Sequence, residues 1–197
     1  MIAIQRHAIL FVGGVHVLGV PKLKRSHIAP FAQTVGAHLS VSPKLDDTSP
    51  QGRVKAIWAS KALKRKAAGS FTPPPDCLYA EDGFIRSVGL GADLIRPCSL
   101  VFDQQGIYFD PSQPSDLEWA LQNRDLSDEQ RQRGALLADV LKKKRINKYN
   151  VGQNDLSLNS EGRRVILVPG QVEDDASVLL GSGDIRSNGA LLEVVRS

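Results

Sequence analysis

The sequence predicts an α/β fold, with a Rossmann-type first domain and the beginning of a second Rossmann-like domain. Short apolar runs alternate with helical patterns, and the run at residues 165–168 is β-branched, as is typical of a buried parallel strand. The composition, 42% hydrophobic and 23% charged, is ordinary for a globular protein and excludes a disordered tail, a collagen-like fibre and a membrane-embedded bundle.

The first element expected is a buried strand that runs into a glycine-containing loop within residues 8–20. A secretion signal is the alternative interpretation of this apolar stretch. However, the stretch contains His16 and three glycines, lacks a small-x-small cleavage pattern and leads into a basic segment at 21–25. We therefore favour the strand.

Residues 54–58 and 77–80 are both typical of strands, and a helix is expected between them over 61–68. Ser60 is the expected N-cap of this helix, because its hydroxyl can accept a hydrogen bond from the first turn. Gly69 is expected at the C-terminal end, where glycine adopts the left-handed conformation without strain.

The next segment predicts a hairpin and then two helices. The hairpin would pair strands at 99–103 and 107–110 through a turn that contains Gly106. Ser115 and Ser127 then begin the helices, since each is followed three residues later by the Glu or Gln of a capping box. The second helix has an apolar side and a basic C-terminal end, favourable for its dipole: Leu137, Val140, Leu141 and residues 142–145.

Two domains are expected, divided near residue 160. Residues 1–160 form an N-terminal α/β domain, whereas residues 161–197 supply the first strand, loop and helix of an incomplete C-terminal domain. Ser187 would open that last helix. No returning strand follows it in this sequence, so the pattern is half of a βαβ unit.

The charge and the reactive side chains narrow the function classes. The net charge of +4 suits a weak attraction to anions such as sugar nucleotides but is too small to indicate nucleic acid. Cys77 and Cys98 cannot form a disulfide framework, so reduced, buried thiols in a cytosolic protein are expected. The histidines lack metal-ligand spacing and are expected in the core or on the surface: His7, His16, His27 and His38.

The first candidate site runs from Glu81 to Ser87. Glu81, Asp82, Gly83 and Arg86 follow the end of a predicted strand, and ligands of open α/β sheets bind beyond the carboxyl ends of strands. An ordinary acidic turn with Arg86 in a surface ion pair remains the alternative.

The second candidate site lies at residues 169–177, again directly after a predicted strand. Glu173, Asp174 and Asp175 repel one another, and a loop has no structural need for three consecutive carboxylates. They could hold a divalent metal, supply a nucleophile or general base, or form a solvated cluster, and we favour a site. The helix N-terminus at Ser187 is a weaker candidate for binding phosphate.

Together these motifs resemble the bacterial capsule polysaccharide synthesis and export proteins, whose best-understood members are Kdo transferases. The resemblance runs from about residue 54 onward. It rests on five stretches, namely 81–91 (EDGFIRSVGLG), 103–110 (DQQGIYFD), 115–118 (SDLE), 148–150 (KYN) and 168–177 (VPGQVEDDAS).

The resemblance implies a two-domain, GT-B-like glycosyltransferase that retains the anomeric configuration. Such an enzyme uses CMP-Kdo, without a metal or other cofactor, to build a β-Kdo linker on a phosphatidylglycerol lipid. Residues 1–160 would be its acceptor-side domain, and residues 161–197 would begin the donor-side domain. The implied location is the cytoplasm with peripheral contact to the inner membrane, in polysaccharide biosynthesis and transport. The implied partners are CMP-Kdo, the lipid-linked Kdo acceptor, other capsule assembly proteins and the rest of the same protein.

The resemblance also implies residue roles. A Q-x-x-x-D pattern falls on Gln171 and Asp175, which makes Asp175 the nucleophile. Glu81 or Asp82 would be the base that takes the acceptor proton, and the Arg86 guanidinium would pair with a Kdo carboxylate. The implied substrate-binding residues are Arg86, Ser87, Gln171, Glu173 and Asp174.

One departure from the family concerns the donor side. A downstream K-P-H-P segment, which serves the nucleotide phosphate in the family, does not occur in the 197 residues. We therefore expect a fragment, a split gene product or a shortened form that lacks most of the donor domain and is inactive alone.

Two other function classes remain open. One is a non-catalytic capsule assembly or export component that binds glycolipid or partner proteins. The other is a metal-dependent nucleotide-sugar enzyme, which requires the carboxylates of residues 173–175 to converge on one ion. Glycosyl transfer instead requires Asp175 and the Glu81–Asp82 pair to line one groove, with carboxyl oxygens within about 10 Å of one another.

Overall fold

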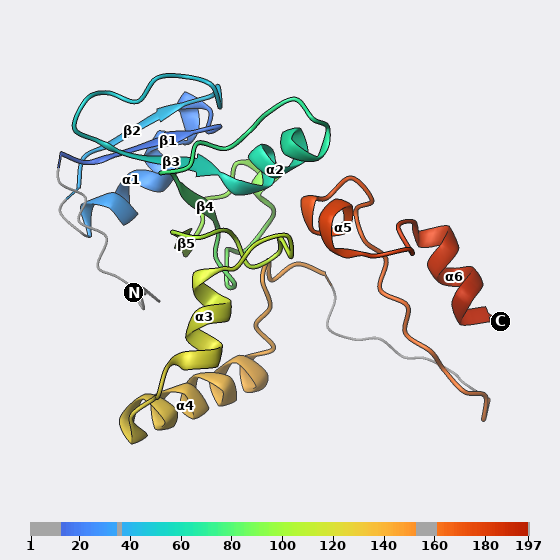
Figure 1. Cartoon of the computed structure of the whole chain (residues 1–197). Helices are drawn as coiled ribbons and strands as arrows, with labels where there is room; N and C mark the ends of the chain where they lie inside the picture. The colour runs from blue at the N-terminus through green and yellow to red at the C-terminus, as the bar shows by residue number, and fades with distance from the viewer. Residues whose placement is uncertain (1–12, 35–36, 153–160, 197) are drawn as a thin grey trace.

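A computed structural model describes residues 13–34, 37–152 and 161–196 of the chain. Its centre is a five-stranded sheet with the order β2-β1-β3-β4-β5 (Figure 1). The first four strands are parallel, and β5 is antiparallel to β4. The strands are β1 (Val15–Leu18), β2 (Leu39–Ser42), β3 (Val54–Trp58), β4 (Leu78–Asp82) and β5 (Leu100–Asp103). The α/β fold class is confirmed.

Helices cover both faces of the sheet. The short 3-10 helix η1 (Lys22–Lys24) and α1 (Arg25–Gln33) follow β1, whereas α2 (Ala59–Ala67) follows β3. Successive residues of a strand point to opposite faces. Ala56 of β3 therefore joins the core cluster that contains Ile28 of α1, and Ile57 joins the cluster that contains Leu63 of α2.

The strands expected at the start of the chain and at 54–58 are confirmed as β1 and β3, and the strand expected at 77–80 is confirmed as β4. The expected start of the helix between β3 and β4 is wrong, since α2 begins at Ala59 with Trp58 as its N-cap. Ser60 lies in the first turn, where its backbone N–H donates to the Glu81 carboxylate. The expected end is confirmed: Gly69 has φ +66°, and its N–H donates to the Lys66 carbonyl.

The expected hairpin at 99–110 is wrong. Residues 100–103 form β5, but they pair with β4, and residues 107–110 form a turn. The Asp103 carboxylate explains this turn, because it accepts hydrogen bonds from the backbone N–H groups of Gln105, Gly106 and Asp116. These bonds fold the chain directly into the next helix, while the side chain of Ile107 is fully buried.

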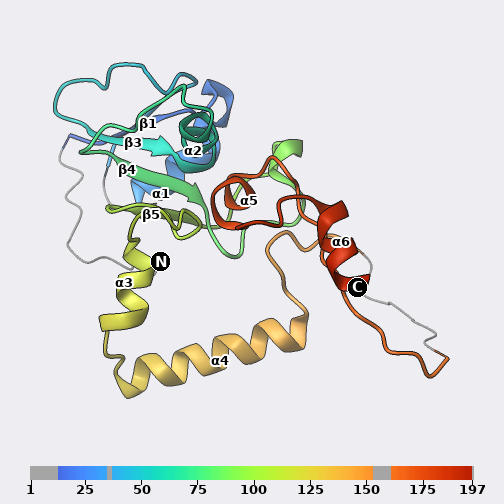
Figure 2. The same cartoon turned by 45° about the vertical axis from the view of Figure 1, so that its right-hand side comes forward.

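The two capped helices are present as α3 (Asp116–Asn123) and α4 (Asp128–Lys144). Ser115 accepts a hydrogen bond from the Glu118 N–H, and Ser127 forms a complete capping box with Gln130. Both helices extend away from the sheet (Figure 1 and Figure 2), so the apolar side of α4 is only partly covered by described residues. None of the described helices is long and apolar enough to cross a bilayer.

The strand expected at 165–168 is wrong. Val165, Ile166 and Leu167 are exposed, and they pair with no strand within the described residues. Two helices follow, α5 (Ala176–Gly181) and α6 (Asn188–Arg196). Helix α5 packs against α2 and buries Ala176 completely in the cluster around Leu63 (Figure 2).

Only one of the two expected buried thiols is buried. Cys77 lies in the core, where burial raises the pKa of its thiol to about 11, whereas Cys98 is exposed. Neither forms a disulfide.

Candidate functional site

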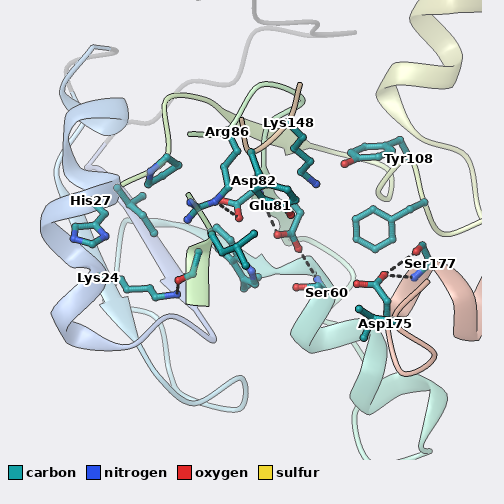
Figure 3. A pocket seen from close by; sticks show the side chains of 18 residues that line it. Lys24, His27, Ser60, Glu81, Asp82, Arg86, Tyr108, Lys148, Asp175 and Ser177 are labelled. Atoms are coloured by element: carbon teal, nitrogen blue, oxygen red, sulfur yellow. Dashed lines mark hydrogen bonds and ion pairs between the residues drawn. The ribbon is translucent and has the colours of Figure 1, made fainter. Parts of the chain in front are cut away.

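A pocket of about 670 Å³ lies at the carboxyl ends of β1, β3 and β4 (Figure 3). This is the end of a parallel sheet at which ligands bind, and it includes the point between β1 and β3 where the strand order changes side, since β2 lies on one side of β1 and β3 on the other. Each strand supplies lining residues from the segment at or just after its end, namely Lys24 and His27, Trp58 and Ser60, and Glu81 and Asp82.

Glu81 is a buried carboxylate at the end of β4. Its Oε2 accepts a hydrogen bond from the backbone N–H of Ser60 at 2.8 Å, and its Oε1 accepts one from the N–H of Asp82 at 3.1 Å. Burial raises the pKa of Glu81, and the hydrogen bonds offset this only in part. A carboxylate with a raised pKa is suited to moving protons near neutral pH.

Asp82 and Arg86 form an ion pair beside Glu81. The Arg86 Nε donates to Asp82 Oδ2 at 2.7 Å, and Nη1 donates to the Ser87 hydroxyl at 2.8 Å. The Arg86 side chain is only 4% exposed, so the alternative of a surface ion pair is wrong. Ser87 is itself buried and holds the guanidinium while donating to the Gly89 carbonyl.

Asp175 reaches the same pocket from the far end of the chain (Figure 3). It is the N-cap of α5, where Oδ1 accepts from the Ser177 N–H at 2.9 Å and from the Ser177 hydroxyl at 2.7 Å. Burial acts to raise the pKa of Asp175, but these hydrogen bonds and the charges of Lys64 and Lys148 outweigh it and lower the pKa. The pocket therefore holds two carboxyl groups whose pKa values are shifted in opposite directions, as in acid–base pairs of known enzymes.

The other residues expected around Asp175 lie outside the pocket lining. The Gln171 backbone exchanges two hydrogen bonds of 2.9 Å with the Asn188 side chain, and Glu173 Oε1 accepts from the Asn188 N–H at 2.7 Å. Asp174 pairs with Lys64 at 3.1 Å. These residues hold the loop against α6 and α2, which is a structural role.

The same contacts concern two alternative sites considered above, a metal site at residues 173–175 and a phosphate site at the helix N-terminus near Ser187. The carboxylates of residues 173–175 engage three different partners, and the described part of the chain contains no group of three His, Cys, Asp or Glu side chains that could hold a metal ion. The helix N-terminus considered for phosphate is already occupied, since the Ser187 hydroxyl accepts from the Ala190 N–H and Glu173 accepts from Asn188.

Several pocket residues were not among the expected site residues: Lys24, His27, Tyr108 and Lys148. Lys148 is attached to the first candidate site, because its carbonyl accepts hydrogen bonds from the N–H groups of Arg86 and Ser87. Burial acts to lower its pKa, but Tyr108, Tyr149 and Glu81 outweigh this and raise it. Only its place in the KYN stretch pointed to it, since a lone lysine after a basic helix end has no distinctive spacing. His7 lies outside the described residues.

Comparison with known proteins identifies relatives of this chain. Residues 75–153 match a protein family described as capsule polysaccharide biosynthesis protein. The capsule polysaccharide modification protein LipA of Neisseria meningitidis is 40% identical over 193 residues, which cover 93% of this chain and 27% of LipA. The lipopolysaccharide-processing protein LpsZ of Rhizobium meliloti is 40% identical over 121 residues, 59% of this chain and 27% of LpsZ. The chain thus spans 27% of the length of these relatives.

Two solved structures from Thermosulfurimonas dismutans share the fold. The KpsC beta Kdo 2,7 transferase has a TM-score of 0.64 and 28% identity, over 93% of this chain and 57% of that one. The KpsC beta Kdo 2,4 transferase has a TM-score of 0.61 and 30% identity, over 87% of this chain and 52% of that one. The resemblance to capsule polysaccharide proteins and the GT-B-like fold class are confirmed.

Proposed function

We propose that this chain contributes part of the active site of a retaining Kdo glycosyltransferase in capsule polysaccharide biosynthesis. The proposed donor is CMP-Kdo and the proposed acceptor a lipid-linked Kdo saccharide, which would place the reaction at the cytoplasmic face of a membrane. One observation carries the proposal: Glu81, Asp82, Arg86 and Asp175 line a single pocket in a chain that is 28% and 30% identical to two Kdo transferases.

In the first step, the Asp175 carboxylate attacks the anomeric carbon of the donor. The bond between that carbon and the phosphate oxygen breaks, CMP leaves with the electron pair, and the sugar is held as an ester of Asp175. The lowered pKa of Asp175 supports this role, because the carboxylate is then ionised at neutral pH. The Ser177 hydrogen bonds fix Oδ1, which leaves Oδ2 as the proposed nucleophilic atom.

In the second step, a hydroxyl of the acceptor attacks the same carbon and displaces the Asp175 carboxylate. The hydroxyl proton passes to a base, and two successive inversions give net retention. We assign the base to Glu81 rather than Asp82, because Asp82 is held in the ion pair with Arg86 whereas the raised pKa of Glu81 suits proton transfer. Arg86 keeps a positive charge beside the reacting groups, where a Kdo carboxylate would bind.

The matched pair Asp175→Asn and Asp174→Asn tests this function in the protein that contains residues 1–197. Asn caps a helix about as well as Asp, so Asp175→Asn should keep α5 folded. With CMP-Kdo and a Kdo-terminated lipid acceptor, it should lower the rate of transfer by about 10³-fold or more. Asp174→Asn should remain near wild type, because its carboxylate is 78% exposed and pairs with Lys64.

Two outcomes contradict the proposal. Near-normal transfer by Asp175→Asn would remove the nucleophile assignment. A wild-type protein that binds the glycolipid but neither binds CMP-Kdo nor transfers Kdo would favour a non-catalytic binding component.

A further inference from the structure

The pocket has the proposed nucleophile at one end and two basic side chains, Lys24 and His27, at the other. In Figure 3, Asp175 and Ser177 lie at one end, Lys24 and His27 lie at the other, and Glu81 is between them. The nucleophile and the base therefore occupy one end and the middle. Lys24 and His27 have no role in the two steps described above.

Local structure brings the basic side chains together. Lys24 is the last residue of η1, and His27 follows three positions later in the first turn of α1, so both face the same side. The chain after β4 meets them there. The Lys24 Nζ donates to the Gly91 carbonyl at 3.4 Å, and an added Cβ at Gly91 would lie 2.8 Å from the Arg86 Nη2.

The positive charge at this end is not balanced by described residues. Asp82 pairs with Arg86, but within 13–34, 37–152 and 161–196 no acidic side chain forms an ion pair with Lys24 or His27, or with Arg96, a residue outside the pocket lining whose charge acts on His27. The pKa of His27 records this imbalance. It is lowered by burial and then by the positive charges of Arg96, Lys24 and Arg86. These charges disfavour a proton on His27, whereas a bound anion would favour it and would also offset the charge of Lys24.

The wall beside Lys24 and His27 is apolar. Ile28, Leu90 and Pro97 line the same pocket, and Leu90 is 43% exposed. A ligand that fits this end therefore combines an anionic group with a non-polar surface, such as the C–H face of a sugar or a glycerol backbone.

We propose that Lys24 and His27, with Arg86 behind them, form a subsite for the anionic group of the acceptor. That group is either the carboxylate of a terminal sugar acid or the phosphate of a lipid headgroup. This inference rests on the proposed function, because the donor carbon must sit at Asp175 and the acceptor hydroxyl at Glu81. The cationic end is then left for the rest of the acceptor.

Binding of small probes to the chain tests the subsite and separates the two sources. One pair of probes is the methyl β-glycoside of Kdo and its neutral methyl ester; the other is glycerol 1-phosphate and glycerol. At low salt, the charged member of at least one pair should bind about tenfold more tightly than its neutral partner. Preference within the first pair identifies the sugar carboxylate, and preference within the second identifies the phosphate.

Substitutions connect that preference to the named residues. Lys24→Gln and His27→Gln should each reduce the ratio of charged-probe to neutral-probe affinity by roughly threefold to tenfold. Lys22→Gln is the matched control, because Lys22 carries the same charge on η1 but is exposed and does not line the pocket. Equal binding of charged and neutral probes would overturn the subsite. An equal effect of Lys22→Gln and Lys24→Gln would also overturn it.

The failures of the two proposals are distinguishable. If transfer depends on Asp175 but the Lys24 and His27 variants keep the wild-type KM for the acceptor, the subsite is wrong and the transferase function stands. If the anion preference depends on Lys24 but the protein neither binds CMP-Kdo nor transfers Kdo, the subsite stands and the transferase function is wrong.

Discussion

The Glu81 carboxylate accepts a hydrogen bond from the backbone N–H of Ser60, with 2.8 Å between Oε2 and the nitrogen. This bond joins the end of β4 to the first turn of α2, across 21 residues of sequence. The exposed N–H groups of a helix N-terminus favour an anion, whereas burial disfavours it. Burial prevails, because the pKa of Glu81 is raised.

The raised pKa predicts a pH-dependent contribution of Glu81 to stability. Relative to Glu81→Gln, the free energy of unfolding of the wild type should fall as pH rises from about 4, the ordinary range of a glutamate, to the raised folded-state pKa. In this window the folded protein holds a proton that the unfolded chain has lost. Above the folded-state pKa the difference should be constant.

Urea denaturation from pH 4 to pH 8 measures this difference. Glu193→Gln, at an exposed position of α6, is the control and should run parallel to the wild type. A Glu81→Gln protein whose stability follows the wild-type pH dependence would contradict the burial argument.

Gly83 is required by close packing. Its N–H donates to the Ser99 carbonyl at 2.9 Å, and an added Cβ would lie 2.6 Å from the Cβ of Ser99. Gly83→Ala should therefore lower the free energy of unfolding by roughly 1–3 kcal/mol. Gly134→Ala, where α4 leaves the Cβ position open, should raise it by about 0.5–1 kcal/mol. Chemical denaturation should show changes in the free energy of unfolding of opposite sign for the two variants. Changes of the same sign would contradict the close-packing argument.

The Arg86 guanidinium has a geometric role that lysine cannot fill. Arg86 donates to Asp82 and Ser87 from two different nitrogens of a planar group, which a single ammonium cannot reproduce. Arg86→Lys should lower the free energy of unfolding by roughly 1–3 kcal/mol, and Arg86→Ala by about 3–5 kcal/mol. Arg131→Lys, in an exposed pair with Asp128 on α4, should leave the denaturation midpoint unchanged. If Arg86→Lys also leaves the denaturation midpoint unchanged, the protein does not require two donors on one planar group.

The proposed ester on Asp175 predicts a trapped adduct. With CMP-Kdo and without acceptor, the protein that contains residues 1–197 should gain the mass of one Kdo residue. Trypsin would place it on the peptide of residues 165–186, which contains both Asp174 and Asp175. Asp174→Asn should retain the adduct and Asp175→Asn should lose it. An adduct on another peptide would move the nucleophile elsewhere.

Short sequence motifs predicted those elements whose geometry depends only on residues close in the sequence. The caps at Ser115, Ser127 and Ser187 formed as expected, because a hydroxyl and an N–H two or three residues away meet in any helix start. Gly69 ended α2 because glycine adopts the left-handed conformation there without strain. The strand at 165–168 failed, since a strand needs a partner from elsewhere, and β-branched residues alone do not supply one.

The sequence by itself determined the α/β class, the family resemblance and three pocket carboxylates, Glu81, Asp82 and Asp175. These carboxylates could be found because each lies in a recognisable sequence motif. Only the tertiary structure decided which charges meet. It placed Asp174 against Lys64 and brought Lys24 and His27 into the pocket. The physical reason is that charge interactions and burial depend on distance in space, and segments such as α5 and β4 become neighbours only when the sheet and its helices have packed.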